Sequence, residues 1–205
     1  MLANAFNIFD NMFFLIDYVA AGLILAVVLI LFFLKKINRF VLSLFFLGFL
    51  IGLTWELPLG LARELEIPIA TFTNTKPFMP FPLHSIIHSL WDGGIFLIGV
   101  GFIWLYSKEA FFNSFNLKEL LILEAWGQVQ SFIIELSSIL GGGWEYIPCW
   151  WNPSLFVING HCFTLFPQLV WVVAGVVFYI LAVKIKRILS ERSNSTYKTN
   201  TKRAR

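Results

Sequence analysis

Charged residues are scarce in this sequence. Only 13% of its 205 residues are Asp, Glu, Lys or Arg, whereas 58% are hydrophobic and the mean hydropathy is +0.77. Soluble domains carry about a quarter charged residues, so a water-soluble fold of this length would have no place for so many apolar side chains. The composition therefore predicts an integral membrane protein, and the length fits one compact bundle without a second domain.

Several motifs are also missing. No glycine-rich loop that could hold a phosphate is visible, and Gly141 to Gly143 only let a loop bend. The N-terminal segment lacks the basic residues and the short apolar run of a cleavable signal peptide, so we expect its apolar run to be the first span. We expect no cofactor and no nucleic-acid partner, because clustered basic residues beside apolar segments are first a topology signal.

Five apolar segments are long enough to cross a membrane, which takes roughly 20 mostly apolar residues for ~30 Å of hydrocarbon. The sequence thus predicts an all-α integral membrane bundle, a single transmembrane domain over residues 1–188. A polar, basic tail follows at residues 189–205, and we expect it to be disordered. The predicted spans lie at about residues 13–34, 40–62, 83–106, 119–140 and 163–183.

The distribution of basic residues predicts the orientation. Of the 15 Lys and Arg residues, 13 fall in the first connection, the third connection and the tail, whereas Arg63 and Lys76 fall on the opposite side. By the positive-inside rule the crowded side is cytoplasmic, so the N-terminus is outside and the C-terminus is cytoplasmic. The last residues resemble a dibasic retrieval signal of the endoplasmic reticulum, although a solvated basic tail is the simpler explanation.

Both cysteines, Cys149 and Cys162, fall in the aromatic loop before the fifth span. If that loop faces an oxidising lumen, a disulfide could close it. Two unpaired thiols packed among Trp and Phe side chains are the alternative. The sequence leaves both open, because the geometry that a disulfide requires cannot be read from it.

Polar and ionisable residues recur inside the spans at helical spacing. In the third span, His84, His88 and Asp92 are four residues apart and share one face of a helix. Ionisable groups inside a membrane are costly and usually face the interior of a bundle. A second stripe at helical spacing runs along the fourth span and comprises Glu124, Gln128, Ser131, Glu135 and Ser138.

Counting along antiparallel spans brings most of these side chains to a similar depth, in the outer half of the membrane. We therefore predict one polar pocket there. The candidates for catalysis are Glu56, His88, Asp92 and Glu135. The candidates for ligand binding are His84, Gln128, Gln168, Trp55, Trp91 and Trp171. Polar side chains can also serve only as interhelical hydrogen bonds, which contribute about 1 kcal/mol each.

Three kinds of function fit such a pocket. In acid–base chemistry on a lipid, a buried Glu donates a proton, a neighbouring His accepts one, and Trp faces stabilise a carbocation. In a metal-dependent enzyme, His84 and His88 would be ligands on one helical face, although the metalloprotease motif with its adjacent Glu is absent. In a transporter or channel component the acids would form an ion path, but the odd number of spans does not favour paired halves.

Four short segments carry a family resemblance. They are LSLFFLGFLIGLTWELPLG with Glu56, SIIHSLWDGGIFLIG with His88, EAWGQVQSFIIELSS with Gly127 and Gln128, and PQLVW with Gln168 and Trp171. Together with the number and order of the spans, they resemble the EXPERA, or emopamil-binding protein, family of membrane proteins, which includes sterol Δ8–Δ7 isomerase. The resemblance covers roughly residues 40–185. His88 stands at the place of a family glutamate, and Gln168 replaces an asparagine.

The resemblance implies that the pocket binds a sterol-like or cationic amphiphilic ligand from the surrounding membrane lipids, without a cofactor. It implies that Glu56 is the proton donor or the partner of an ammonium group. His88 would be its acid–base companion, and Trp171 a wall that stabilises a cation. A lipid isomerase-like function follows from this resemblance, with the metal-dependent enzyme and the transporter as alternatives.

Overall fold

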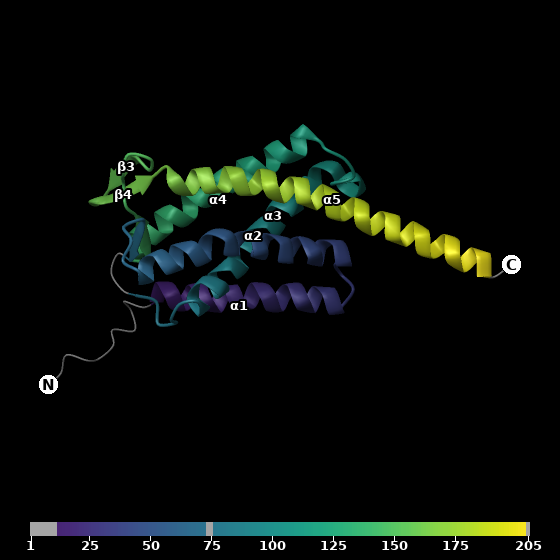
Figure 1. Ribbon diagram of the computed structural model, residues 1–205, viewed down its shortest axis with the longest axis horizontal. Helices are drawn as coiled ribbons and strands as arrows, with labels where there is room; N and C mark the ends of the chain where they lie inside the picture. The colour runs from purple at the N-terminus through teal and green to yellow at the C-terminus, as the bar shows by residue number, and fades with distance from the viewer. Residues whose placement is uncertain (1–11, 73–75, 204–205) are drawn as a thin grey trace.

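Five long helices make up most of the protein. The computed structural model describes residues 12–72 and 76–203, with side chains as far as residue 191. The helices are α1 (Met12–Phe33), α2 (Arg39–Glu64), α3 (Leu83–Ser107), α4 (Leu117–Gly141) and α5 (Phe166–Arg203), with a short 3-10 helix, η1 (Lys108–Ala110), after α3. They run side by side as one bundle (Figure 1). Residues 1–11 of the predicted transmembrane domain lie outside the described residues.

Four short strands lie at one end of the bundle, which we call the strand end; α5 leaves the bundle at the opposite, tail end (Figure 1). The strands are β1 (Ala70–Phe72), β2 (Trp144–Tyr146), β3 (Ser154–Ile158) and β4 (His161–Thr164). β1 pairs antiparallel with β2, and β3 pairs antiparallel with β4. The sequence pattern indicates only an aromatic loop here.

Cys149 and Cys162 are not joined, so the structure shows the unpaired alternative.

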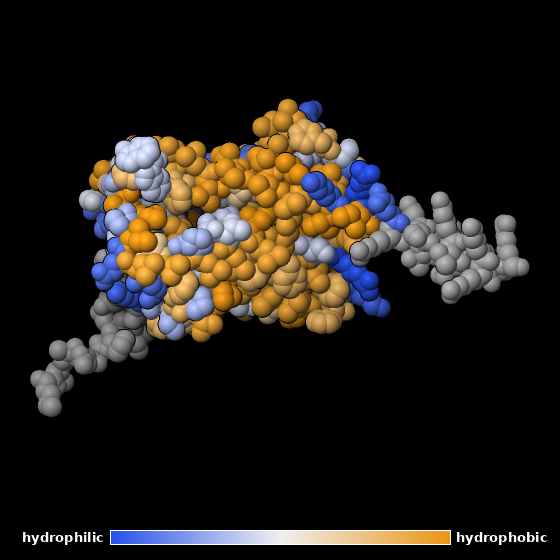
Figure 2. Space-filling model, viewed as in Figure 1, coloured by the Kyte–Doolittle hydropathy of each residue, from blue (hydrophilic) through white to orange (hydrophobic). Residues whose placement is uncertain are grey.

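Among the described residues, four helical segments are long and apolar enough to cross a membrane: α1, α2, α3 together with η1, and residues Phe166–Glu191 of α5. Apolar side chains cover the middle of the bundle, and hydrophilic ones gather toward its two ends (Figure 2). These features agree with an integral membrane protein. Helix α4 is also 25 residues long and packs against α3 and α5, but it carries more polar residues. The predicted span boundaries match the helices to within three residues, except at the end of α5.

The last helix continues beyond the predicted span. Disorder is predicted for residues 189–205, whereas α5 reaches Arg203 as one helix. The sequence after Gly175 contains neither proline nor glycine, so nothing in it stops the helix. One turn of this extension is also tied by an ion pair, in which Arg187 Nε lies 2.9 Å from Glu191 Oε1. Residues 204–205 lie outside the described part of the chain.

Helices α2 and α3 pack very closely because glycines line their interface. A Cβ added at Gly48 would lie 2.8 Å from the Phe96 ring, and one added at Gly93 would lie 2.9 Å from the Phe45 ring. A Cβ at Gly52 would collide with the carboxyl group of Asp92. This close approach brings the polar residues of α2 beside those of α3.

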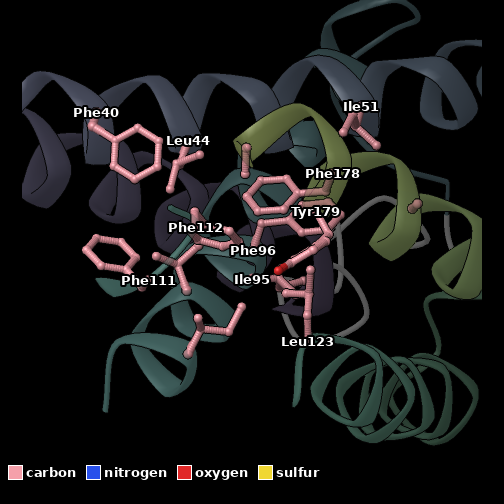
Figure 3. Close-up of a cluster of buried hydrophobic side chains, with 14 of the residues drawn as sticks. Phe40, Leu44, Ile51, Ile95, Phe96, Phe111, Phe112, Leu123, Phe178 and Tyr179 are labelled. Carbon is pink, nitrogen blue, oxygen red and sulfur yellow. The ribbon is translucent and has the colours of Figure 1, made fainter. Parts of the chain in front are cut away.

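An apolar cluster fills the bundle where α3, α4 and α5 meet (Figure 3). At its centre the rings of Phe96 and Phe178 stack with centroids 4.2 Å apart. Leu123 from α4 and Phe112 from the connection after η1 are both buried in the same cluster. This packing fixes the positions of the three helices relative to one another.

Glu119, in the first turn of α4, holds the tail end together. It is almost completely buried, and it accepts hydrogen bonds from Ser107 Oγ at 2.5 Å, Phe112 N at 3.2 Å and Tyr179 Oη at 3.0 Å. These donors come from α3, from the connection before α4 and from α5. One carboxyl group therefore joins three parts of the chain.

We expect the Tyr179→Phe substitution to lower the free energy of unfolding by about 1–2 kcal/mol, because it removes a donor to a buried carboxyl group. The same hydroxyl accepts from Asn116 N at 2.8 Å, and that amide would also lose its partner. Thermal unfolding in detergent micelles measures the change. The control is Tyr106→Phe on the exposed surface of α3; an equal effect of both substitutions would contradict the role of Glu119.

Candidate functional site

A cavity of about 270 Å³ lies between the helices toward the strand end. Its walls come from all five helices and from β2, and they consist mostly of apolar and aromatic side chains. The ionisable groups among them are Asp17, Glu56, His88, Asp92, Glu135 and Tyr146. An apolar cavity with a few convergent polar groups is the usual form of a small-molecule site.

His88 is the centre of the polar wall. Its Nδ1 lies 3.2 Å from both carboxyl oxygens of Asp17 on α1, and its Nε2 lies 3.8 Å from Glu56 Oε1 on α2. The edge contact with the Trp144 ring, whose centroid is 4.9 Å away, orients the imidazole further. Both ring nitrogens therefore face carboxyl groups that belong to two other helices.

Two features position Asp17 beside His88. The indole Nε1 of Trp91 on α3 donates a hydrogen bond of 3.0 Å to the backbone oxygen of Asp17. Asp17 is 7% exposed, so its carboxyl group depends on the imidazole rather than on water. Helices α1 and α3 are thus joined at Asp17 by two contacts, the hydrogen bond from Trp91 to its backbone oxygen and the pair of its carboxyl group with His88.

Asp92 completes a group that we call the acid cluster: Asp17, Glu56, His88 and Asp92. Asp92 is 4% exposed, and its Oδ2 has no hydrogen-bond partner among the described residues. Three carboxyl groups thus surround one imidazole, which can balance only one negative charge. An unbalanced buried charge is costly, so the acid cluster is stable only as a group whose charges compensate one another.

Aromatic rings form the rest of the wall. The rings of Trp55 and Trp171 meet edge to face with centroids 5.5 Å apart, and Trp91 lines the same cavity. Tyr146, on β2 at the strand end, is buried, and burial raises the pKa of its phenol well above the ordinary value. Its hydroxyl therefore stays neutral and can donate a hydrogen bond into the cavity.

Seven of the ten candidates from the sequence line this cavity. They are Glu56, His88, Asp92, Glu135, Trp55, Trp91 and Trp171. Glu135 reaches it from α4 and is 8% exposed. The spacing of four residues on α3 brings His88 and Asp92 to the same wall, and the parts of α2 and α4 at the strand end add one glutamate each.

The other three candidates lie elsewhere. His84 is buried one turn before His88, with its Nδ1 2.9 Å from the hydroxyl of Tyr18. Gln128 donates a hydrogen bond of 3.1 Å from Nε2 to the backbone oxygen of Gln168, so both residues join α4 to α5. Neither Gln128 nor Gln168 lines the cavity.

The sequence pattern misses Asp17, Trp144 and Tyr146, although all three line the cavity. Asp17 is the one ionisable carboxyl group within the 22 residues of α1, and a lone acid in an apolar helix is a signal that could have identified it. Trp144 and Tyr146 belong to β2, whose pairing with a strand more than 70 residues earlier has no local signal.

The geometry does not favour the metal-site alternative. The rings of His84 and His88 stack with centroids 5.9 Å apart, and each has a partner other than a shared ligand. Within residues 12–72 and 76–203, no group of three or more His, Cys, Asp or Glu side chains is arranged to hold a metal ion.

Comparison with known proteins identifies no relative: no family model, no curated protein and no solved structure matches the chain. The resemblance to the EXPERA family therefore stays a prediction. The function has to be argued from the residues around the cavity.

We expect a strong energetic coupling between Asp17 and His88. Breaking a buried pair leaves an uncompensated charge, so a double-mutant cycle with Asp17→Asn and His88→Gln should give a coupling of about 2 kcal/mol or more. The matched control is the pair Glu145–His161, whose side chains are 25% and 35% exposed at an N–O distance of 2.9 Å. A half-exposed pair should give at most about 1 kcal/mol. Equal couplings in unfolding experiments would show that the Asp17–His88 contact is not a buried pair.

Proposed function

We propose that this protein binds a sterol-like lipid in the cavity and shifts a carbon–carbon double bond in it by acid–base catalysis. One observation carries the proposal: His88 is held between Asp17 and Glu56 in the wall of a mostly apolar cavity that Trp55 and Trp171 also line. The apolar walls match a hydrocarbon ring system, and the acid cluster supplies reactive groups that such a ligand would meet.

The proposed reaction is a transfer of protons in two steps. A proton from the acid cluster is added to one carbon of the double bond, and the other carbon becomes a carbocation. A proton is then removed from the neighbouring carbon on the far side, and the double bond re-forms one position along. No proton or electron is gained or lost overall, so the reaction needs no oxidant, reductant or cofactor.

Each group has a defined role in this scheme. Glu56 is the proton donor, and His88 is the acid–base companion that accepts a proton and returns it to the cluster. Asp17 holds the imidazole in place, and Asp92 and Glu135 are further proton carriers at the wall. Trp171 stabilises the carbocation through its electron-rich face.

The same arrangement explains why a cationic amphiphile should also bind. An ammonium group in the cavity would take the place of the carbocation, next to Glu56 and close to the Trp55–Trp171 pair. Such a ligand needs only an apolar body of similar shape, because its charge is met by the carboxyl groups and the indole faces.

Interhelical hydrogen bonding alone does not account for the cluster. Polar residues that only join helices need one partner each, as Gln128 has in the Gln168 backbone. Here three carboxyl groups converge on one imidazole, and Asp92 Oδ2 is left without a partner among the described residues. Unpaired buried groups of this kind are typical of reactive sites rather than of helix packing.

We also propose that all five helices span the membrane, including α4, with the N-terminus outside and the C-terminus in the cytoplasm. A helix of 25 residues is about 37 Å long, which is enough to span. Its polar residues Ser131, Glu135 and Ser138 are buried inside the bundle, so its lipid-facing side is apolar.

The orientation is tested with reporter fusions. Alkaline phosphatase, which folds only outside the cytoplasm, should be inactive when fused after Arg205 and active when inserted in the hairpin turn after Asn159. Green fluorescent protein at the same two positions should give the opposite result. Phosphatase activity at Arg205 would overturn the proposed cytoplasmic position of the C-terminus, and activity at both positions would show that α5 does not cross the membrane.

The isomerisation is tested by hydrogen exchange. The purified protein is incubated in deuterated detergent buffer with a sterol that carries one ring double bond, and the product is examined by mass spectrometry and NMR. We expect deuterium at the protonated carbon and a shifted double bond. His88→Gln and Glu56→Gln should each slow both changes by about 10²–10⁴-fold, the usual contribution of a general acid or base.

The control is Glu124→Gln on α4, which removes a carboxyl group that packs against Gly175 and does not line the cavity. It should leave the rate unchanged. Retention of the sterol without deuterium would make the protein a binder and overturn the isomerase. About one zinc or iron per purified chain, lost on His88→Ala, would replace the proposal with a metal-dependent enzyme.

A further inference from the structure

Two smaller cavities lie beside Arg63, where α2 ends at the strand end. One, of about 80 Å³, is lined by Arg63, Lys76 and Ser85 among others; the second, of about 350 Å³, also has Arg63 and Lys76 in its walls. Arg63 and Lys76 are the only Lys or Arg residues in α2 after Arg39 and in the two connections at the strand end. Both positive charges at the strand end therefore face the same space.

Two donors in this space lack acceptors. Arg63 Nη2 and Ser85 Oγ are buried and have no hydrogen-bond partner among the described residues. Arg63 lies over the ring of Phe72 at 4.9 Å, but that contact uses the face of the guanidinium group and leaves its in-plane N–H groups free. Ser85 is completely buried, so water at the surface does not satisfy its hydroxyl.

A glycine lets the Ser85 hydroxyl lie close against α2 in the lining of the smaller cavity. A Cβ added at Gly60 would collide with Ser85 Oγ and would lie 2.9 Å from Cδ2 of Phe81. The absence of this one carbon leaves room for the unpaired hydroxyl itself. The space is small, polar on one side and open toward Lys76, which suits a compact anion.

The surrounding charge also favours an anion. Ser85 lies in the first turn of α3, whose N-cap residue, Pro82, makes no side-chain cap. A helix N-terminus carries a partial positive charge, and free amides there bind phosphate groups. Glu64 is the one carboxyl group in the lining of the smaller cavity, and it is exposed to solvent.

We propose that Arg63, Lys76 and Ser85 form a binding site for a phosphate group, which a phospholipid headgroup supplies at the outer membrane surface. The site lies where α2 ends and α3 begins. For helices that span the membrane, this is the depth of the lipid headgroups. Arg63 and Lys76 neutralise the phosphate charge, and Ser85 donates a hydrogen bond to it. The site is separate from the acid cluster and does not depend on the isomerase proposal.

The proposal is tested by lipid titration of the full chain in detergent micelles, followed by native mass spectrometry. Dioleoylphosphatidylglycerol should bind, whereas dioleoylglycerol, which has the same chains but no phosphate, should not. Arg63→Gln should weaken the binding about tenfold or more, because a hydrogen bond to a charged group is lost. The control is Lys118→Gln, which removes one positive charge at the tail end and should leave the affinity unchanged.

Gly60→Ala gives an independent test, since the added Cβ would displace the Ser85 hydroxyl without changing any charge. We expect it to weaken phosphatidylglycerol binding as Arg63→Gln does. Inorganic phosphate is titrated in parallel: if it binds as tightly and is equally sensitive to Arg63→Gln, the site stands and its ligand is free phosphate. Equal binding of dioleoylglycerol, or full affinity in both the Arg63→Gln and the Gly60→Ala proteins, would overturn the site.

Discussion

The pairing of His88 with carboxyl groups from two other helices is the interaction on which the rest of the bundle depends. Asp17 and Glu56 are each 7% exposed, and an unpaired carboxylate at such a depth would cost several kcal/mol. α1 and α2 can bury them only because α3 presents an imidazole between the two. That placement in turn requires α2 and α3 to approach closely, which Gly52 permits by leaving room for Asp92. The glycines of the α2–α3 interface are therefore required for the pairing of the buried acids with His88.

The same constraint explains why the cavity stays open. Four carboxyl groups line it, and an apolar side chain packed against them would leave their oxygens without partners. Filling an ordinary gap in a bundle with an apolar side chain stabilises the fold, but filling this cavity would not, because carboxyl groups line it. The rigid rings of Trp55, Trp171 and Trp144 instead keep the walls apart, while the apolar cluster around Phe96 and Phe178 closes the adjoining part of the bundle (Figure 3). A protein that only needed to be stable would not gather these acids in one place.

The parts of the fold that were predictable from the sequence are those with a local cause. Apolar runs of about 20 residues define the helices, and the spacing of His88 and Asp92 places them on one face. The strand β2 was not predictable, because its pairing with β1 joins residues far apart in the chain, and with it the sequence pattern missed Trp144 at the cavity. Helical spacing also could not separate Gln128 from Glu135, since both lie on one face of α4 and only their depth differs. The tail is helical although its composition is polar, because composition alone does not end a helix.

The two proposed sites follow from one property of the α2–α3 pair. Along α2, Glu56 and Arg63 are seven residues apart, which is about two turns, so both point toward α3. Opposite them, α3 presents His88 to the glutamate and Ser85 to the space beside the arginine. Carboxyl groups thus collect around the cavity, and a positive group lies at the helix ends, beside the proposed phosphate site. The charge therefore changes sign along a single helix interface, from the carboxyl groups around the cavity to Arg63 near the end of α2.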